Sequence, residues 1–141
     1  MLYFAYGSNL SIQNRIKNKI NIIKVKNYKL KGYKICFRDP YGDPDLEKSS
    51  KSFVPGVLYK FNSIEELKLD KYENFPLYYK KTFIKNLNIM FYEMNIKSNY
   101  SKANPLILNY IISGYRENNI PLSSFNNQRK INISNRMCQR S

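Results

Sequence analysis

The chain opens with Met1-Leu2-Tyr3-Phe4-Ala5-Tyr6-Gly7-Ser8-Asn9-Leu10, a short apolar and aromatic run that stops at a glycine. The run predicts a buried first strand, and the glycine with the small polar residues after it predicts a tight turn that caps a helix. Isoleucines then follow with a spacing of four, at Ile12, Ile16 and Ile20. The sequence therefore begins strand, turn, helix, and the spacing predicts that these isoleucines share one apolar face of that helix.

Strand and helix patterns alternate along the rest of the 141 residues, a length typical of one domain with its own core. Extended patterns are predicted over residues 22–37 and 53–61, with a bend or bulge at Gly32. The stretch between them, residues 38–52, contains prolines, glycine and serines and is predicted to be a long loop that borders a site.

Two further elements are predicted in the second half, each from its turn and capping residues. Asn62 and Ser63 are expected to cap a helix that Pro76 ends. Residues 78–84 and 89–96 are expected to form a hairpin around Asn86.

The clearest helix is predicted to begin with Asn104 as its cap and Pro105 at its first position. Its apolar side is expected to hold Leu108, Ile111, Ile112 and Tyr115, and Gly114 indicates close packing. We predict one domain over residues 1–125 and a basic tail over residues 126–141.

Composition excludes several kinds of catalytic site. The sequence has no histidine, which removes serine-histidine and cysteine-histidine chemistry and histidine-based zinc sites. Its two cysteines, Cys36 and Cys138, lie far apart in the sequence, and we interpret them as a strand residue and a tail thiol. Any catalysis is therefore expected to use carboxylates, lysine, tyrosine, hydroxyls or backbone amides.

Lysine and arginine outnumber aspartate and glutamate by 24 to 10, which gives a formal net charge of +14. Such a charge attracts polyanions. The cations are spread along the chain without an arginine-rich block, so we expect no specific nucleic-acid partner. No apolar run approaches the roughly 20 residues of a membrane span, and no secretory signal is recognised, so we expect a cytoplasmic protein without a membrane partner.

The turn from Tyr6 to Leu10 is the first candidate site. A glycine turn between a strand end and a helix start aims backbone N–H groups and the positive end of the helix dipole at one point. The turn thus suits a carboxylate or a developing oxyanion. The alternative is a well-capped strand-to-helix turn without a ligand.

The second candidate is the segment Leu69-Asp70-Lys71-Tyr72-Glu73-Asn74-Phe75-Pro76. A carboxylate at Glu73, at a helix end and among aromatic rings, is partly removed from water, which raises its pKa and makes it a better proton acceptor near neutral pH. The alternative is an ordinary solvated glutamate. Asp70 is expected to orient neighbouring groups.

Together these segments resemble the gamma-glutamylcyclotransferase-like family, which includes the plant avirulence-induced protein group. The resemblance covers roughly residues 1–125. It rests on Tyr3 to Leu10 as the signature turn, Gly56 to Tyr59 as a central strand, Leu69 to Tyr79 as the catalytic-glutamate segment, and Tyr110 with Gly114 to Pro121 as the closing helix.

The resemblance implies an α+β fold with a mixed, barrel-like sheet and surrounding helices. It also implies an enzyme that converts a gamma-glutamyl amino acid or gamma-glutamylamine to 5-oxoproline and a free amine, with no metal or organic cofactor. Glu73 would be the general acid and base. The substrate-binding residues would be Tyr6, Gly7, Ser8, Asn9, Leu10, Tyr79 and Tyr110.

Alternatives within the fold are an enzyme that cleaves a related gamma-glutamyl compound or glutathione, and an inactive module that binds a small acid. A basic nucleic-acid-binding protein is the alternative from another class. The chain is expected to be a monomer or a homodimer. Asn74 departs from the glycine that such proteins often carry there, although asparagine tolerates left-handed backbone. The leaving amine is not predicted.

Overall fold

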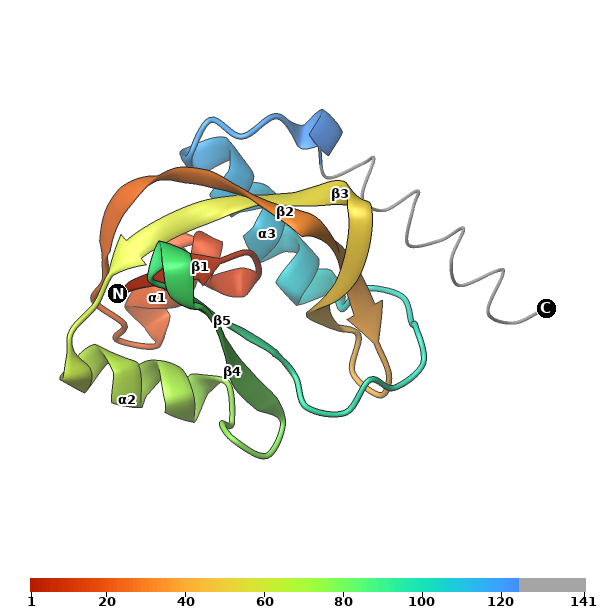
Figure 1. Cartoon of the computed structure of the whole chain (residues 1–141), viewed down its shortest axis with the longest axis horizontal. Coiled ribbons are helices and arrows are strands. Elements are labelled where there is room, and N and C mark those ends of the chain that lie inside the picture. The colour runs from red at the N-terminus through yellow and green to blue at the C-terminus, as the bar shows by residue number, and fades with distance from the viewer. Residues whose placement is uncertain (125–141) are drawn as a thin grey trace.

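A five-stranded sheet with β1 (Leu2–Ala5) at its centre organises the fold, as the computed structural model of residues 1–124 shows (Figure 1). β1 runs antiparallel to β3 (Asp43–Lys60) and parallel to β5 (Ile89–Met94). The edge strands of this sheet are β2 (Ile23–Arg38) and β4 (Tyr79–Ile84). The predicted mixed α+β fold is confirmed, and the sheet is not closed into a barrel because β2 and β4 remain its edges.

The predicted loop over residues 38–52 is wrong. β2 continues to Arg38 and pairs antiparallel with β3 from Asp43, so only a short turn separates two long strands (Figure 1). β1 pairs with β3 only at residues 57–60 of β3. At Pro44 and Pro55, β3 therefore has ladder partners in β2 alone, and its other side is free of ladder hydrogen bonds. Proline is tolerated in a strand where its missing N–H has no ladder partner.

The predicted bulge at Gly32 is confirmed. The β2–β3 register shifts between Lys31 and Tyr33, and Gly32 has a φ of 85°, in the left-handed region. Glycine adopts this backbone at no steric cost.

The predicted apolar face after the first turn is also wrong. The turn contains the short helix η1 (Ser8–Leu10), and α1 (Ile12–Lys17) follows it. Ile12 and Ile16 are exposed, whereas Asn14 is buried and Ile20 lies in the core beyond the helix. Asn14 faces inward because its side-chain amide donates to the Asn9 side-chain oxygen at 3.0 Å.

The remaining predicted elements are confirmed with small changes of boundary. α2 (Ser63–Tyr72) is capped by the Asn62 side chain, which accepts a hydrogen bond from the Glu65 backbone N–H at 2.9 Å. β4 and β5 form the predicted hairpin through the short helix η2 (Lys85–Leu87). α3 (Pro105–Glu117) is capped by Asn104, and its buried residues include Ile111, Gly114 and Tyr115.

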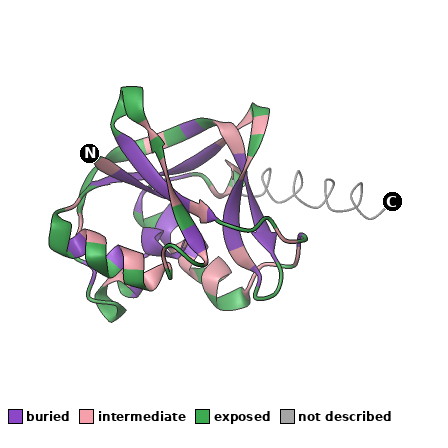
Figure 2. Cartoon of the chain, turned by 60° about the horizontal axis from the view of Figure 1, so that its bottom comes forward, coloured by how far each residue is buried: buried purple, intermediate pink, exposed green. Residues whose placement is uncertain are grey.

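Burial is concentrated in β1, in the second half of β3 and in β5, and also in the ends of β2 and β3 beside the turn that joins them (Figure 2). Cys36 is buried in β2, as predicted. None of the helices in residues 1–124 is long and apolar enough to cross a membrane. The predicted basic tail and Cys138 lie outside the described residues.

Candidate active site

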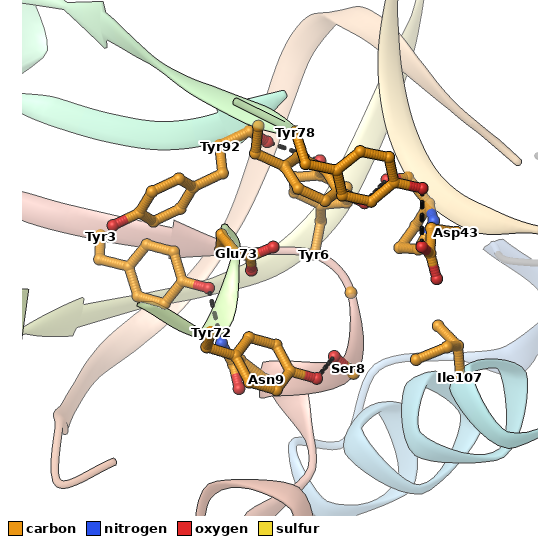
Figure 3. Close-up of a pocket in the computed structure, with 13 residues that line it drawn as sticks. Tyr3, Tyr6, Ser8, Asn9, Asp43, Tyr72, Glu73, Tyr78, Tyr92 and Ile107 are labelled. Atoms are coloured by element: carbon orange, nitrogen blue, oxygen red, sulfur yellow. Dashed lines mark hydrogen bonds between the residues drawn. The ribbon is translucent and has the colours of Figure 1, made fainter. Parts of the chain in front are cut away.

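A cavity of about 120 Å³ lies between the turn after β1 and the end of α2 (Figure 3). Its walls are mainly tyrosine rings, with two carboxylates and no lysine or arginine among the described lining residues. The residues that line it are Tyr3, Tyr6, Gly7, Ser8, Asn9, Asp43, Pro44, Tyr72, Glu73, Tyr78, Tyr79, Tyr92 and Ile107.

Glu73 is placed in the cavity by the way α2 ends. Asn74 has a φ of 51°, and its N–H donates to the Lys71 carbonyl at 3.2 Å, while the Phe75 N–H donates to the Asp70 carbonyl at 2.9 Å. These two hydrogen bonds form a Schellman motif, in which the residue after the cap adopts a left-handed backbone. Asparagine fills the position that glycine usually takes, so Glu73 becomes the helix cap and the chain reverses immediately after it.

The Glu73 carboxylate lies at the centre of the cavity, among Tyr3, Tyr6, Tyr72 and Tyr92 (Figure 3). Within residues 1–124, no group donates a hydrogen bond to it or forms an ion pair with it, although its neighbours are all hydrogen-bonded to other groups. Burial, followed by the negative charge of Asp43, raises the pKa of Glu73 to about 8. The negative end of the α2 dipole acts in the same direction.

The turn after β1 presents backbone donors at the same cavity. Leu10 N–H donates to the Gly7 carbonyl and Ser11 N–H to the Ser8 carbonyl, both at 3.1 Å. In the described part of the chain, the N–H groups of Gly7, Ser8 and Asn9 donate to no other residue. Buried backbone donors are almost always satisfied, so these amides are available to a ligand or to water.

Hydroxyl groups of the tyrosines fix the walls of the cavity. Tyr6 donates to the Tyr92 carbonyl at 2.6 Å, and Tyr79 donates to the Pro44 carbonyl at 2.6 Å. The Tyr72 hydroxyl lies 2.6 Å from the Ser8 hydroxyl and accepts a hydrogen bond from Asn14. The rings are thus held in place, and burial raises the pKa of Tyr6 and of Tyr79, which keeps both neutral.

The structure brings most of the predicted site residues to this cavity, namely Tyr6, Gly7, Ser8, Asn9, Glu73 and Tyr79. It does not bring two others. Leu10 is fully buried under α3, against Gly114, and supports the turn from behind. Tyr110 lies on α3 away from the lining, and Ile107, one turn earlier on the same helix, takes part in the wall instead.

Seven lining residues were not among the predicted site residues, namely Tyr3, Asp43, Pro44, Tyr72, Tyr78, Tyr92 and Ile107. Tyr3 and Tyr92 carry no sequence signal that separates them from core tyrosines. The stretch that was wrongly predicted to be a loop contains four acidic residues, Asp39, Asp43, Asp45 and Glu47. No sequence feature separates Asp43 from the other three. No group of three or more histidine, cysteine, aspartate or glutamate side chains lies close enough to hold a metal ion within residues 1–124.

The sequence model of the family described as "Gamma-glutamyl cyclotransferase, AIG2-like" matches residues 3–107, which include every residue that lines the cavity. The chain belongs to this family. None of the curated protein sequences compared with the chain matches it significantly.

Solved structures of this family's fold are similar to the chain. A structure described as gamma-glutamyl cyclotransferase is 23% identical with a TM-score of 0.69, and the alignment covers 91% of this chain and 85% of that one. An uncharacterized protein from Homo sapiens is 24% identical with a TM-score of 0.68 and the same coverage. YkqA from Bacillus subtilis is 21% identical with a TM-score of 0.77, and the alignment covers 94% of this chain and 54% of YkqA. These similarities establish the fold.

Proposed function

We propose that the chain is a gamma-glutamylcyclotransferase-type enzyme that converts a gamma-glutamyl amino acid or gamma-glutamylamine to 5-oxoproline and a free amine. The observation that carries the proposal is the Glu73 carboxylate, which lies among tyrosine rings without a hydrogen-bond partner in residues 1–124, beside three backbone amides that are unpaired in the same residues. Family membership supports the same reaction class.

The reaction needs no nucleophile from the protein, which suits a chain without histidine. The α-amino nitrogen of the substrate attacks its own γ-carbonyl carbon, the new carbon–nitrogen bond closes a five-membered ring, and the bond to the leaving amine breaks. A cavity that holds the substrate folded brings these two atoms together. Positioning of this kind contributes on the order of 7 kcal/mol to lowering a barrier.

Glu73 would move the proton in this reaction. It takes a proton from the α-ammonium, which frees the nitrogen lone pair for attack, and then returns this proton to the leaving nitrogen. The ring nitrogen loses a second proton as the new amide forms, and this proton also ends on the amine, which leaves as an ammonium ion. Its raised pKa of about 8 suits both steps, because a carboxyl with an ordinary pKa is a poor proton donor at neutral pH. A substrate ammonium beside Glu73 favours the ionised carboxylate, so binding itself activates the base.

The amides of Gly7, Ser8 and Asn9 would bind the glutamyl carboxylate or the oxyanion that develops on the γ-carbonyl. Each donor in such a site is typically worth about 3 kcal/mol of transition-state stabilisation. Because no lysine or arginine lines the described cavity, these amides are the main candidates for that role.

The test is the release of 5-oxoproline from a panel of gamma-glutamyl amino acids, gamma-glutamylamines and glutathione. We expect Glu73→Gln to lower kcat by about a hundredfold or more, the usual size of general acid–base catalysis. Glu66→Gln is the matched control, because Glu66 lies on the same helix but does not line the cavity. Equal activity of Glu73→Gln and the unsubstituted protein would refute this mechanism.

A chain that releases no 5-oxoproline but binds 5-oxoproline or glutamate in calorimetry would instead be a small-acid binding module. Glu73→Gln should bind such acids in either case, so a variant that keeps binding but loses turnover assigns Glu73 to catalysis and not to binding.

A further inference from the structure

The cavity has an enclosed end and an open end. Tyr3, Asn9 and Tyr92 at one end are buried, whereas Asp43 and Ile107 at the other are only partly buried (Figure 3). If the glutamyl group lies against Glu73 and Asn9, toward the enclosed end, the rest of the substrate leaves past Asp43 and Ile107, and Gly7, which is itself partly buried and lies against Pro44, borders that path. These two residues therefore face the leaving amine.

Asp43 is held rigidly at this mouth. Gly42 before it has a φ of 71° and packs so closely on the segment before α3 that an added Cβ would lie 2.3 Å from the Lys102 carbonyl oxygen. The Asn104 N–H donates to the Gly42 carbonyl at 2.9 Å, which joins the β2–β3 turn to the start of α3. The position of Asp43 relative to Ile107 is thus fixed by backbone contacts.

The charge of Asp43 is not neutralised. Its carboxylate accepts a hydrogen bond from the Tyr78 hydroxyl at 2.8 Å, and no described lysine or arginine forms an ion pair with it. Among its described lining residues, the cavity thus has two carboxylates and no cation, in a chain whose formal net charge is +14. A partly buried carboxylate without a counter-charge favours a cation and repels an anion.

We propose that Asp43 selects the leaving amine, favouring gamma-glutamylamines that carry a second positive charge over gamma-glutamyl α-amino acids. A leaving α-amino acid bears a carboxylate on the carbon next to the scissile nitrogen, which places that carboxylate at the mouth beside Asp43. An amine with an ammonium group on an alkyl chain has no such repulsion, and its chain can contact Ile107 while the ammonium reaches Asp43. This inference rests on the proposed function and names its substrate class.

The test compares three gamma-glutamyl amides with the same four-carbon linker, made from putrescine, pentylamine and aminovaleric acid. Their linkers end in an ammonium, a methyl and a carboxylate. We expect kcat/KM to fall about tenfold at each step, the factor that corresponds to one charge-assisted contact. Asp43→Asn should bring the three values within about threefold of one another, by loss of the same contact.

Asp39→Asn is the matched control, because Asp39 is exposed on the same β2–β3 turn and does not line the cavity. It should keep the tenfold steps. A second measurement needs no substitution: high salt should compress the steps in the unsubstituted protein, since it screens a partly exposed charge. A preference that survives both high salt and Asp43→Asn would overturn the inference.

The outcomes also separate this inference from the proposed function. Release of 5-oxoproline at equal kcat/KM from all three amides would overturn the role of Asp43 and leave the reaction standing. If none of the amides releases 5-oxoproline, the reaction is refuted, and calorimetric binding of the same compounds decides the role of Asp43. Binding in the order ammonium, methyl, carboxylate supports it, and equal binding overturns it.

Discussion

Gly114 of α3 and Leu10 at the end of the first turn lie so close that a Cβ at position 114 would be 2.3 Å from the Leu10 Cβ. The contact presses α3 against the turn whose amides face the cavity. Leu10 is fully buried, so it has no free space into which to move.

We therefore expect Gly114→Ala to destabilise the fold by about 1–3 kcal/mol, the usual cost of overpacking a core. It should also lower 5-oxoproline release, because the turn is displaced with Leu10. Urea unfolding and the activity assay measure the two effects. The neighbouring Ser113→Ala, which adds no bulk, is the control, and an unchanged unfolding midpoint in Gly114→Ala would contradict this contact.

Activity should depend on pH through Glu73. Because the base must be ionised in the free enzyme and its pKa is raised to about 8, kcat/KM should climb as pH approaches 8 and level off above it. Asp43→Asn removes a negative charge that raises this pKa, so the midpoint should shift to lower pH. The pentylamine amide is the substrate of choice, since its neutral end does not respond to Asp43. A midpoint that Asp43→Asn leaves in place would show that the two carboxylates do not interact.

Stability should depend on pH through the same residue. A carboxyl whose pKa is raised from 4.5 to about 8 by folding binds its proton more tightly in the folded state. Its ionisation therefore destabilises the fold progressively as pH rises from about 4.5 to about 8. Glutamine stays neutral, so Glu73→Gln should match the original protein near pH 4.5 and be more stable above pH 8.

The expected gain in the free energy of unfolding at high pH is about 2–4 kcal/mol. This is less than the whole pKa shift would give, because Glu73 is only partly buried. Urea unfolding at the two pH values measures it. A difference between the two proteins that is the same at both pH values would contradict the raised pKa.

A buried ion pair anchors the β2–β3 turn. The Arg38 guanidinium donates to the Asp45 carboxylate at 2.7 Å, and both side chains are almost fully buried. Asp45 also accepts hydrogen bonds from Lys97 and from the Met94 N–H. Arg38→Met leaves the half-exposed Lys97 as the one described cation beside the buried Asp45 carboxylate, so it should cost up to about 3–5 kcal/mol.

The Lys68–Glu65 pair provides a comparison. The Lys68 side chain is 42% exposed, and the buried Glu65 carboxylate also accepts a hydrogen bond from the Asn21 N–H, so Lys68→Met should cost less than Arg38→Met. Thermal unfolding of the two variants ranks them. Similar losses in both would mean that the Arg38–Asp45 pair contributes no more than a pair with one exposed member.

The sequence predicted the site better than the sheet around it. Glu73 and the Gly7 turn are local features, since each depends on a helix end or a strand end that neighbouring residues specify. Asn74 illustrates this, because its left-handed backbone follows from a tolerance that the residue type carries with it. By contrast, the burial of Asp45 depends on Lys97, 52 residues away, and no local pattern reports such a partner.

The errors have the same origin. Pro44 and nearby glycine and serines are typical of a loop, and only the pairing of β3 with β2 shows that a strand accommodates them. The spacing of Ile12 and Ile16 is typical of a buried helix face, but the buried contact of α1 is made by Asn14, whose partners lie on the first turn and on α2. The order of the strands was likewise not specified by local sequence.

The walls of the cavity come from segments spread between Tyr3 and Ile107. They belong to β1 and the turn after it, the start of β3, the end of α2, β4, β5 and α3. A small molecule bound there bridges parts of the chain that separate only when the whole domain unfolds. Its binding energy is therefore added to global stability, and the melting temperature should increase with its concentration. Thermal-shift screening of amines and gamma-glutamyl amides can thus rank ligands before any turnover is detected.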